Sequence, residues 1–146
     1  MDFRSKVATA ILLLTLTSSL TFGQSFEESG LGISGYLETY YSYDFDEPDD
    51  HLRPFFIYNF NRSNEVNVNL AFVKLTYQKE RVRGNLSLMA GTYANANLAS
   101  ETGVLKNIYE ANAGVKLSKE HELWIDAGIL PSHIGFESAI GKDCWT

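Results

Sequence analysis

Apolar and polar residues alternate with a period of two from residue 31 onward. In 31–45 the odd positions are Leu31, Ile33, Gly35, Leu37, Thr39, Tyr41, Tyr43 and Phe45, and the even positions include Ser34, Glu38, Ser42 and Asp44. This period predicts a long β-strand with one apolar and one polar face.

Four further segments repeat the pattern. Their apolar positions are Val66, Val68, Leu70 and Phe72; Val82, Leu86, Leu88 and Ala90; Tyr109, Ala111, Ala113, Val115 and Leu117; and Leu123, Ile125, Ala127 and Ile129. Their polar positions are Glu65, Asn67 and Asn69; Arg83, Asn85 and Ser87; Glu110, Asn112 and Lys116; and Glu122, Trp124 and Asp126. One misfit occurs, because continued alternation in the first of these segments points Lys74 to the apolar side. Either a β-bulge near Val73 turns Lys74 to the polar side, or Lys74 extends to a nearby aqueous interface.

The hairpin over 106–130 has a register that the sequence predicts. A loop at Lys119-Glu120-His121 places Leu117 opposite Leu123, Val115 opposite Ile125 and Ala113 opposite Ala127. All three pairs are apolar, and the same register brings Lys116 within reach of both Glu122 and Asp126.

Residues 1–23 have the layout of an export signal. Arg4 and Lys6 give a positive start, an apolar stretch follows from Val7 to Phe22, and Gly23 is small enough for a cleavage site before Gln24. The alternative, a transmembrane helix, is disfavoured because the stretch is short and contains Thr and Ser.

Strand and connection lengths favour an outer-membrane β-barrel over a soluble sheet. The strands run to roughly 9–15 residues, which is long enough for a tilted membrane strand. Long connections at 46–64 and 94–106 alternate with short ones at 78–81 and 118–122, as do the external loops and periplasmic turns of such barrels. The predicted fold class is all-β: an antiparallel up-and-down barrel, here an open curved sheet of about five strands after the signal peptide.

Such a sheet is incomplete, because bacterial single-chain barrels begin at about eight strands. We therefore expect residues 24–146 to be the N-terminal part of a longer barrel, or to assemble with other chains. The free edges are predicted at 31–45 and 122–130, and the segment 131–146 is predicted to be irregular.

Composition and candidate chemistry narrow the function. The net charge of −6 and the absence of a basic stripe argue against nucleic acid as a partner. An acidic cluster in the first long loop could bind Ca²⁺ or metal-bridged lipopolysaccharide, but it lacks a calcium-loop pattern, and a solvated loop is expected; its members are Asp44, Asp46, Glu47, Asp49 and Asp50.

Neither a catalytic, a cofactor nor a metal site is predicted. The histidines, which are His51, His121 and His133, have no metal-ligand spacing. Ser132 precedes His133 without an evident orienting acid, and the single cysteine, Cys144, cannot form an internal disulfide.

The polar positions are instead predicted to line a water-filled lumen. The candidates are Glu38, Asn67, Asn69, Arg83, Asn85, Glu110, Asn112, Lys116 and Asp126. The charged members either set the electric field that a permeating solute meets, or pair with one another and stiffen the wall; both interpretations stay open at this point.

Several stretches resemble the start of the β-barrel porin-2 (OmpL-like) family. They include Gly35-Tyr36-Leu37-Glu38-Thr39-Tyr40-Tyr41, Tyr58-Asn59-Phe60-Asn61-Arg62, Asn69-Leu70-Ala71-Phe72-Val73, Ala90-Gly91-Thr92-Tyr93, Asn107-Ile108-Tyr109-Glu110-Ala111 and Asp126-Ala127-Gly128-Ile129. In addition, 131–138 is similar to a Gly/Pro-containing stretch of phosphate-selective-type porins. The resemblance carries no catalytic motif and implies a barrel longer than this chain.

The predicted function is passive diffusion of small hydrophilic solutes across the outer membrane of a Gram-negative bacterium, without catalysis or cofactor. The expected partners are outer-membrane lipid, lipopolysaccharide and the solutes, and a homo-oligomer is compatible with the pattern. The alternatives are a structural or partner-binding barrel without transport and, less favoured, an outer-membrane enzyme.

The export signal makes a direct prediction. N-terminal sequencing of the protein recovered from the outer membrane should start close to Gln24, because cleavage follows the small residue Gly23. A mature protein that still begins at Met1 would contradict the signal-peptide interpretation.

Overall fold

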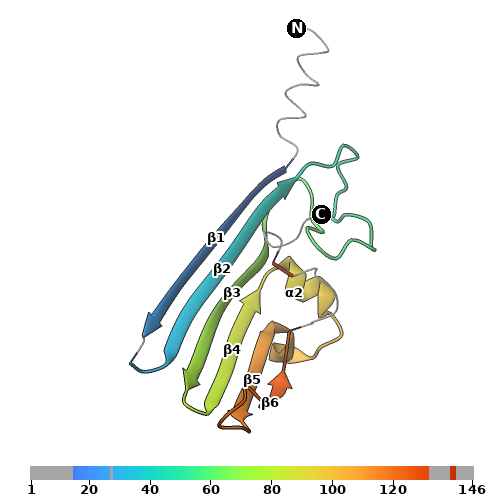
Figure 1. The fold of residues 1–146 in the computed structure, drawn as a ribbon. Coiled ribbons are helices and arrows are strands. Elements are labelled where there is room, and N and C mark those ends of the chain that lie inside the picture. Colours follow the sequence, from blue (N-terminus) through green and yellow to red (C-terminus); the bar gives the residue numbers. More distant parts are fainter. Residues whose placement is uncertain (1–14, 27, 132–138, 141–146) are drawn as a thin grey trace.

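The computed structural model describes residues 15–26, 28–131 and 139–140 of the chain. They form a single antiparallel sheet in which each strand pairs with the next one along the chain (Figure 1). The strands are β1 (Thr15–Phe26), β2 (Leu31–Ser42), β3 (Val66–Lys79), β4 (Val82–Ala90), β5 (Ile108–Lys116) and β6 (Trp124–Ile129). Between β4 and β5 lie a short helix, α2 (Thr92–Asn97), and a 3-10 turn, η1 (Gly103–Asn107). The predicted all-β, up-and-down fold is confirmed.

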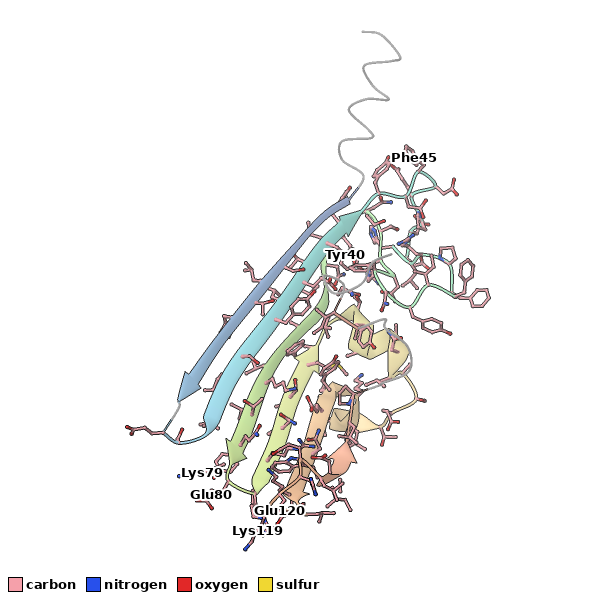
Figure 2. All side chains as sticks on the ribbon, viewed as in Figure 1. Tyr40, Phe45, Lys79, Glu80, Lys119 and Glu120 are labelled. Carbon is pink, nitrogen blue, oxygen red and sulfur yellow. The ribbon has the colours of Figure 1, made fainter. Side chains whose placement is uncertain are left out.

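Short turns and long connections lie at opposite ends of the sheet, as predicted. The β3–β4 turn consists of Glu80 and Arg81 alone, whereas 43–65 joins β2 to β3 and 91–107 joins β4 to β5. Figure 2 shows Lys79, Glu80, Lys119 and Glu120 together at the turn end, with Tyr40 and Phe45 far from them at the other.

The strand count differs from the prediction of about five. The sheet has six strands because 15–26, most of which we assigned to the export signal, pairs with β2 along its full length. The free edges are thus β1 and β6, so the predicted edge at 31–45 is wrong and that at 122–130 is right. The physical reason is that 15–26 also alternates: Leu20 and Phe22 lie opposite Leu37 and Gly35, so the segment satisfies the backbone groups of the β2 edge. Removal of residues 1–23 on export stays a prediction.

A β-bulge between β2 and β3 decides which side chains share a face. Glu38 lies opposite Leu70, but the next residue, Thr39, lies opposite Val68, so Asn69 is an extra residue in β3. Both Asn69 and Leu70 therefore turn to the same side of the sheet, where they are almost fully buried.

The bulge corrects part of the predicted facing of β3. Beyond it, Phe72 lies opposite Tyr36 and Lys74 opposite Ser34, on the polar side. The prediction that Leu70 and Phe72 point to the apolar side is therefore wrong. Of the two alternatives for Lys74, the bulge is the one observed: it turns Lys74 to the polar side, but it lies at Asn69 rather than near Val73.

A second irregularity corrects Tyr109. Ser87 pairs with Glu110 while Leu88 pairs with Ile108, which leaves Tyr109 as the extra residue. Tyr109 lies on the polar side, where its ring stacks on Phe72 with centroids 5.3 Å apart. The predicted apolar facing of Tyr109 is wrong for the same reason as in β3.

The predicted register of the last hairpin is confirmed. Val115 lies opposite Ile125 and Ala113 opposite Ala127, and the Leu117 amide donates to the Leu123 carbonyl over 2.8 Å. Alternation on both strands is therefore enough to fix the pairing wherever no bulge intervenes.

The two faces of the sheet differ in composition and exposure. The polar face carries Glu38, Lys74, Arg83, Glu110 and Asp126, and the apolar face carries Leu37, Leu75, Leu86, Val115 and Ile125. The apolar-face side chains are exposed along almost every strand. A contiguous exposed apolar surface of this extent marks a site of contact with lipid or protein.

Helices contribute little to the structure. Within residues 15–26, 28–131 and 139–140, no helix has both the length and the apolar character needed to cross a membrane.

The faces predict a labelling pattern in the native membrane. In a Cys144→Ser background, single cysteines on the apolar face should resist a water-soluble maleimide because lipid covers them, whereas those on the polar face should react. The apolar set is Val66, Leu86, Val115 and Ile125, and the polar set is Asn85 and Asp126; Glu110 lies on the same polar face but is too deeply buried to serve as a labelling site. Equal reactivity of the two sets would refute the assigned faces.

Candidate functional site: the polar face of the sheet

The polar face gathers every residue that the sequence predicted to line a lumen. Register and hydrogen bonds place these residues on one side of the sheet: Glu38, Asn67, Asn69, Arg83, Asn85, Glu110, Asn112, Lys116 and Asp126. These residues come from the five strands β2–β6, and β1 adds Ser19, whose hydroxyl lies 3.3 Å from the Tyr36 hydroxyl. That this surface faces water in a barrel is taken up below.

Arg83 and Asp126 form an ion pair across an intervening strand. Arg83 lies in β4 and Asp126 in β6, and both lie opposite Gly114 of β5. The Arg83 Nε donates to Asp126 Oδ1 over 2.7 Å, and its Nη2 donates to Oδ2. The Arg83 guanidinium also lies 4.4 Å from the centroid of the Trp124 ring, a cation–π distance.

Gly114 makes this contact possible. A Cβ atom at Gly114 would overlap the Asp126 carboxylate and lie 3.2 Å from Arg83 Cγ. Because Gly114 has no side chain, it leaves a passage across β5 through which the long Arg83 side chain reaches the Asp126 carboxylate in bidentate geometry.

Lys74 and Glu110 form a second ion pair that spans an intervening strand, here β4. Lys74 of β3 and Glu110 of β5 both lie opposite Ser87 of β4, and Lys74 Nζ is 2.5 Å from Glu110 Oε2. Ser87 is fully buried beneath the pair. Glu110 is itself almost fully buried, so removing Lys74 would leave an uncompensated charge, which is strongly destabilising.

A third pair lies at the turn end. Lys116 Nζ binds Glu122, while Asp126, its other predicted partner, binds Arg83 instead. The hydrogen bond from Lys116 holds the pKa of Glu122 below its usual value, and a second one from the Trp124 indole acts in the same direction. Glu122 is mostly exposed, so the pair contributes little to stability.

Glu38 differs from these acids because no cation pairs with it among the described residues. It is 3% exposed and accepts two hydrogen bonds, one from the Tyr36 hydroxyl at 2.9 Å and one from Asn69 Nδ2 at 2.8 Å. These bonds satisfy the buried carboxyl group without a salt bridge.

Asn69, the extra residue of the bulge, ties both long connections to the sheet. Its Oδ1 accepts a hydrogen bond from the Phe60 amide of 43–65 at 3.0 Å and from the Thr92 hydroxyl of α2 at 3.3 Å. Asn97 of α2 then donates to the Tyr58 carbonyl over 3.4 Å. The two connections therefore meet over the long-loop end of the polar face.

The connection 43–65 is itself built from local bonds. Leu52 and Arg62 form an isolated bridge, and the His51 Nδ1 lies 3.0 Å from the Ser63 carbonyl. Arg62 also binds Glu65, and this hydrogen bond lowers the pKa of the Glu65 carboxyl.

An aromatic cluster lies under α2 at the same end. Phe72 contacts Tyr36 and Tyr109, with ring centroids 5.5 and 5.3 Å apart. Met89 and Ala94 are buried against these rings. The sequence missed this cluster because Phe72 and Tyr109 were assigned to the other face.

The acidic loop residues do not gather into a site. No group of three or more His, Cys, Asp or Glu side chains within the described residues is arranged to hold a metal ion. Asp44 and Asp50 instead accept hydrogen bonds from the amides of Asp46 and Leu52. Ser132, His133 and Cys144 lie outside the described residues.

Gly114 provides a test of the ion pair. A double-mutant cycle on Arg83→Gln and Asp126→Asn, measured by urea unfolding in detergent, should give a small but favourable coupling free energy for this partly exposed pair. With Gly114→Val the coupling should fall to zero, because the new side chain fills the passage. With Ala113→Val, the matched change on the apolar face of β5, the coupling should persist; its loss there would show that β5 acts only through general stability.

Comparison with known proteins adds the family to this geometry. No curated protein matches the chain, and no solved structure matches it. Residues 30–146 match the family described as "Putative beta-barrel porin-2, OmpL-like". That range covers β2 to β6 and all of the residues predicted to line a lumen, so the chain belongs to this family of outer-membrane β-barrel porins.

Proposed function

We propose that the protein forms a water-filled channel through which small hydrophilic solutes diffuse passively across the outer membrane. One observation carries the proposal: a face of paired charges and amides lies directly behind a face of exposed apolar side chains, in a chain of a porin family. A wall with water on one side and lipid on the other is suited to that combination.

The ion pairs support both roles that the sequence left open. Lys74, Arg83 and Lys116 each bind a carboxylate, so these ion pairs connect the strands that would form the channel wall. The pairs still present strong local dipoles to a solute, which can replace part of its hydration shell. The channel needs no reacting group, and we propose no catalytic or cofactor chemistry.

The proposed setting follows from the same arrangement. The exported chain, after removal of residues 1–23, would reside in the outer membrane of a Gram-negative bacterium. Its apolar face would contact lipid, its long connections would lie at the external end next to lipopolysaccharide, and its short turns would face the periplasm. A homo-oligomer is compatible with this placement.

A partner-binding barrel without transport is the second candidate. The observation in its favour is the tip of 43–65, where Phe55 is 91% exposed and Phe56 and Tyr58 are also exposed. Exposed aromatic residues on a loop are typical of binding surfaces. The firm attachment of this connection to the polar face, through Asn69 and Tyr40, favours a role at the channel mouth instead.

Planar-bilayer recording tests the proposal. The protein, purified at the length that its gene encodes, should give discrete, ohmic conductance steps in potassium chloride, because the polar face leaves a continuous aqueous path. Protein that inserts into the bilayer but gives no conductance would refute the channel and favour the partner-binding barrel.

A further inference from the structure

A cavity of about 500 Å³ lies between the two long connections and the polar face. Asn59 of 43–65, Tyr93 and Asn97 of α2, and Tyr109 of β5 contribute its polar groups, and Met89 of β4 lies among them. The other lining residues are aliphatic or proline, so no charged side chain lines the cavity within the described residues. Its volume lies in the range of roughly 300–1,000 Å³ that is typical of small-molecule sites.

Unused hydrogen-bonding groups face this cavity. Among the described residues, the hydroxyls of Tyr93 and Tyr109 and the side-chain amide of Asn59 have no hydrogen-bond partner. Asn97 uses its Nδ2 on two carbonyls, which leaves its Oδ1 free to accept. A tyrosine hydroxyl and an asparagine amide can each donate and accept, and this pattern matches a ligand whose own hydroxyls do both.

The rings add an apolar surface with fixed orientation. Tyr109 is stacked on Phe72 at an interplanar angle of 4°, so its position is set before any ligand arrives. Burial raises the pKa of Tyr93 further above neutral pH, and a protonated tyrosine hydroxyl can both donate and accept. Carbohydrate-like rings have C–H faces that pack on such aromatic side chains while their hydroxyls reach the amides.

Charged solutes fit the cavity poorly. An ion that entered would lose hydration without meeting an opposite charge, which is costly. A separate cavity of about 660 Å³, toward the turn end, contains Arg83, Glu110 and Asp126. Among the described residues, the lining of the first cavity is thus uncharged, whereas the second cavity is lined by charged side chains.

We infer that the cavity between the two long connections, whose described lining is neutral and polar, is a binding site for neutral, polyhydroxylated solutes of about monosaccharide size, and that it favours them over ions of the same size. The inference rests on the proposed channel function and names the solute class that the channel selects.

Proteoliposome swelling tests the solute class. The protein at its gene-encoded length is reconstituted, and entry of glucose, glucuronate and the glucosammonium ion is compared, since these three solutes share a pyranose ring and differ mainly in charge. Glucose should enter roughly tenfold faster than either ion, because only the ions lose hydration without compensation. Conducting vesicles that admit glucuronate or glucosammonium as fast as glucose would overturn the inference while leaving the channel intact. Protein that inserts without conducting would overturn the proposed function and the inference with it.

Two variants locate the selectivity in the cavity. Tyr93→Leu removes a hydroxyl and an aromatic face and should slow glucose entry about fivefold, the effect of one lost hydrogen bond. Tyr77→Leu, the matched change on the apolar face, should leave it unchanged. Asn97→Asp adds a charge and should raise glucosammonium entry relative to glucose, a gain that a merely damaged fold cannot produce. Unchanged selectivity in both Tyr93→Leu and Asn97→Asp would refute this location.

Discussion

Backbone pairing in a two-residue repeat is the constraint on which this structure depends. Once two strands are in register, every side chain is assigned to a face, and one extra residue reverses the assignment of all that follow. Asn69 is that residue in β3: without it, Lys74 would lie on the exposed apolar face. Glu110, which is almost fully buried, would then have lost its cation. The bulge and the ion pair are therefore linked: in a register without the bulge, the Glu110 carboxylate would be buried and unpaired, which is destabilising.

The spacing of strands explains why the ion pairs skip a strand. Adjacent strands lie about 4.8 Å apart, so partners two strands apart are separated by roughly twice that distance at the backbone. A Lys or Arg side chain can span this gap only when the residue between is small. Gly114 and Ser87 occupy those positions, beneath Arg83–Asp126 and Lys74–Glu110 respectively. Three consecutive strands are thus joined by each pair, which resists shear between them.

The sequence predicted what local alternation determines and missed what depends on neighbouring strands. The hairpin of β5 and β6 was predicted to the residue, because both of its faces agree on one register. The facing of Leu70, Phe72 and Tyr109 was not, because a bulge leaves no mark in the alternation of a single strand apart from a misfit such as Lys74. The partner of Asp126 was also missed: sequence spacing suggested Lys116, which is nearer along the chain, whereas the passage over Gly114 favours Arg83.

The strand β1 is a second case in which the sequence pattern alone did not decide the structure. Its alternation is regular, yet its apolar content and its place after Arg4 and Lys6 matched an export signal better than a membrane strand. Both patterns exist in one segment, because a stretch rich in Leu, Thr, Ser and Phe can satisfy either environment. In the sheet, β1 pairs with the outer edge of β2, and the strand pairings among β2 to β6 do not involve β1. The residues that matter for the proposed channel therefore keep their arrangement whether or not β1 is retained.

In the proposed channel, charge along the polar face would set how a solute is selected. Where cations and carboxylates bind each other, as in Arg83–Asp126, the field is local and a passing ion would meet dipoles of both signs. In the cavity beside α2, whose described lining is uncharged, an ion would meet no opposite charge to replace its hydration. Selection between neutral and charged solutes would therefore take place at this cavity, since the paired charges offer both kinds of solute a comparable surface. Asn69 connects the two regions, because as the extra residue of the bulge it turns Lys74 to the polar face, where Lys74 pairs with Glu110, and its side chain accepts a hydrogen bond from Thr92 of α2.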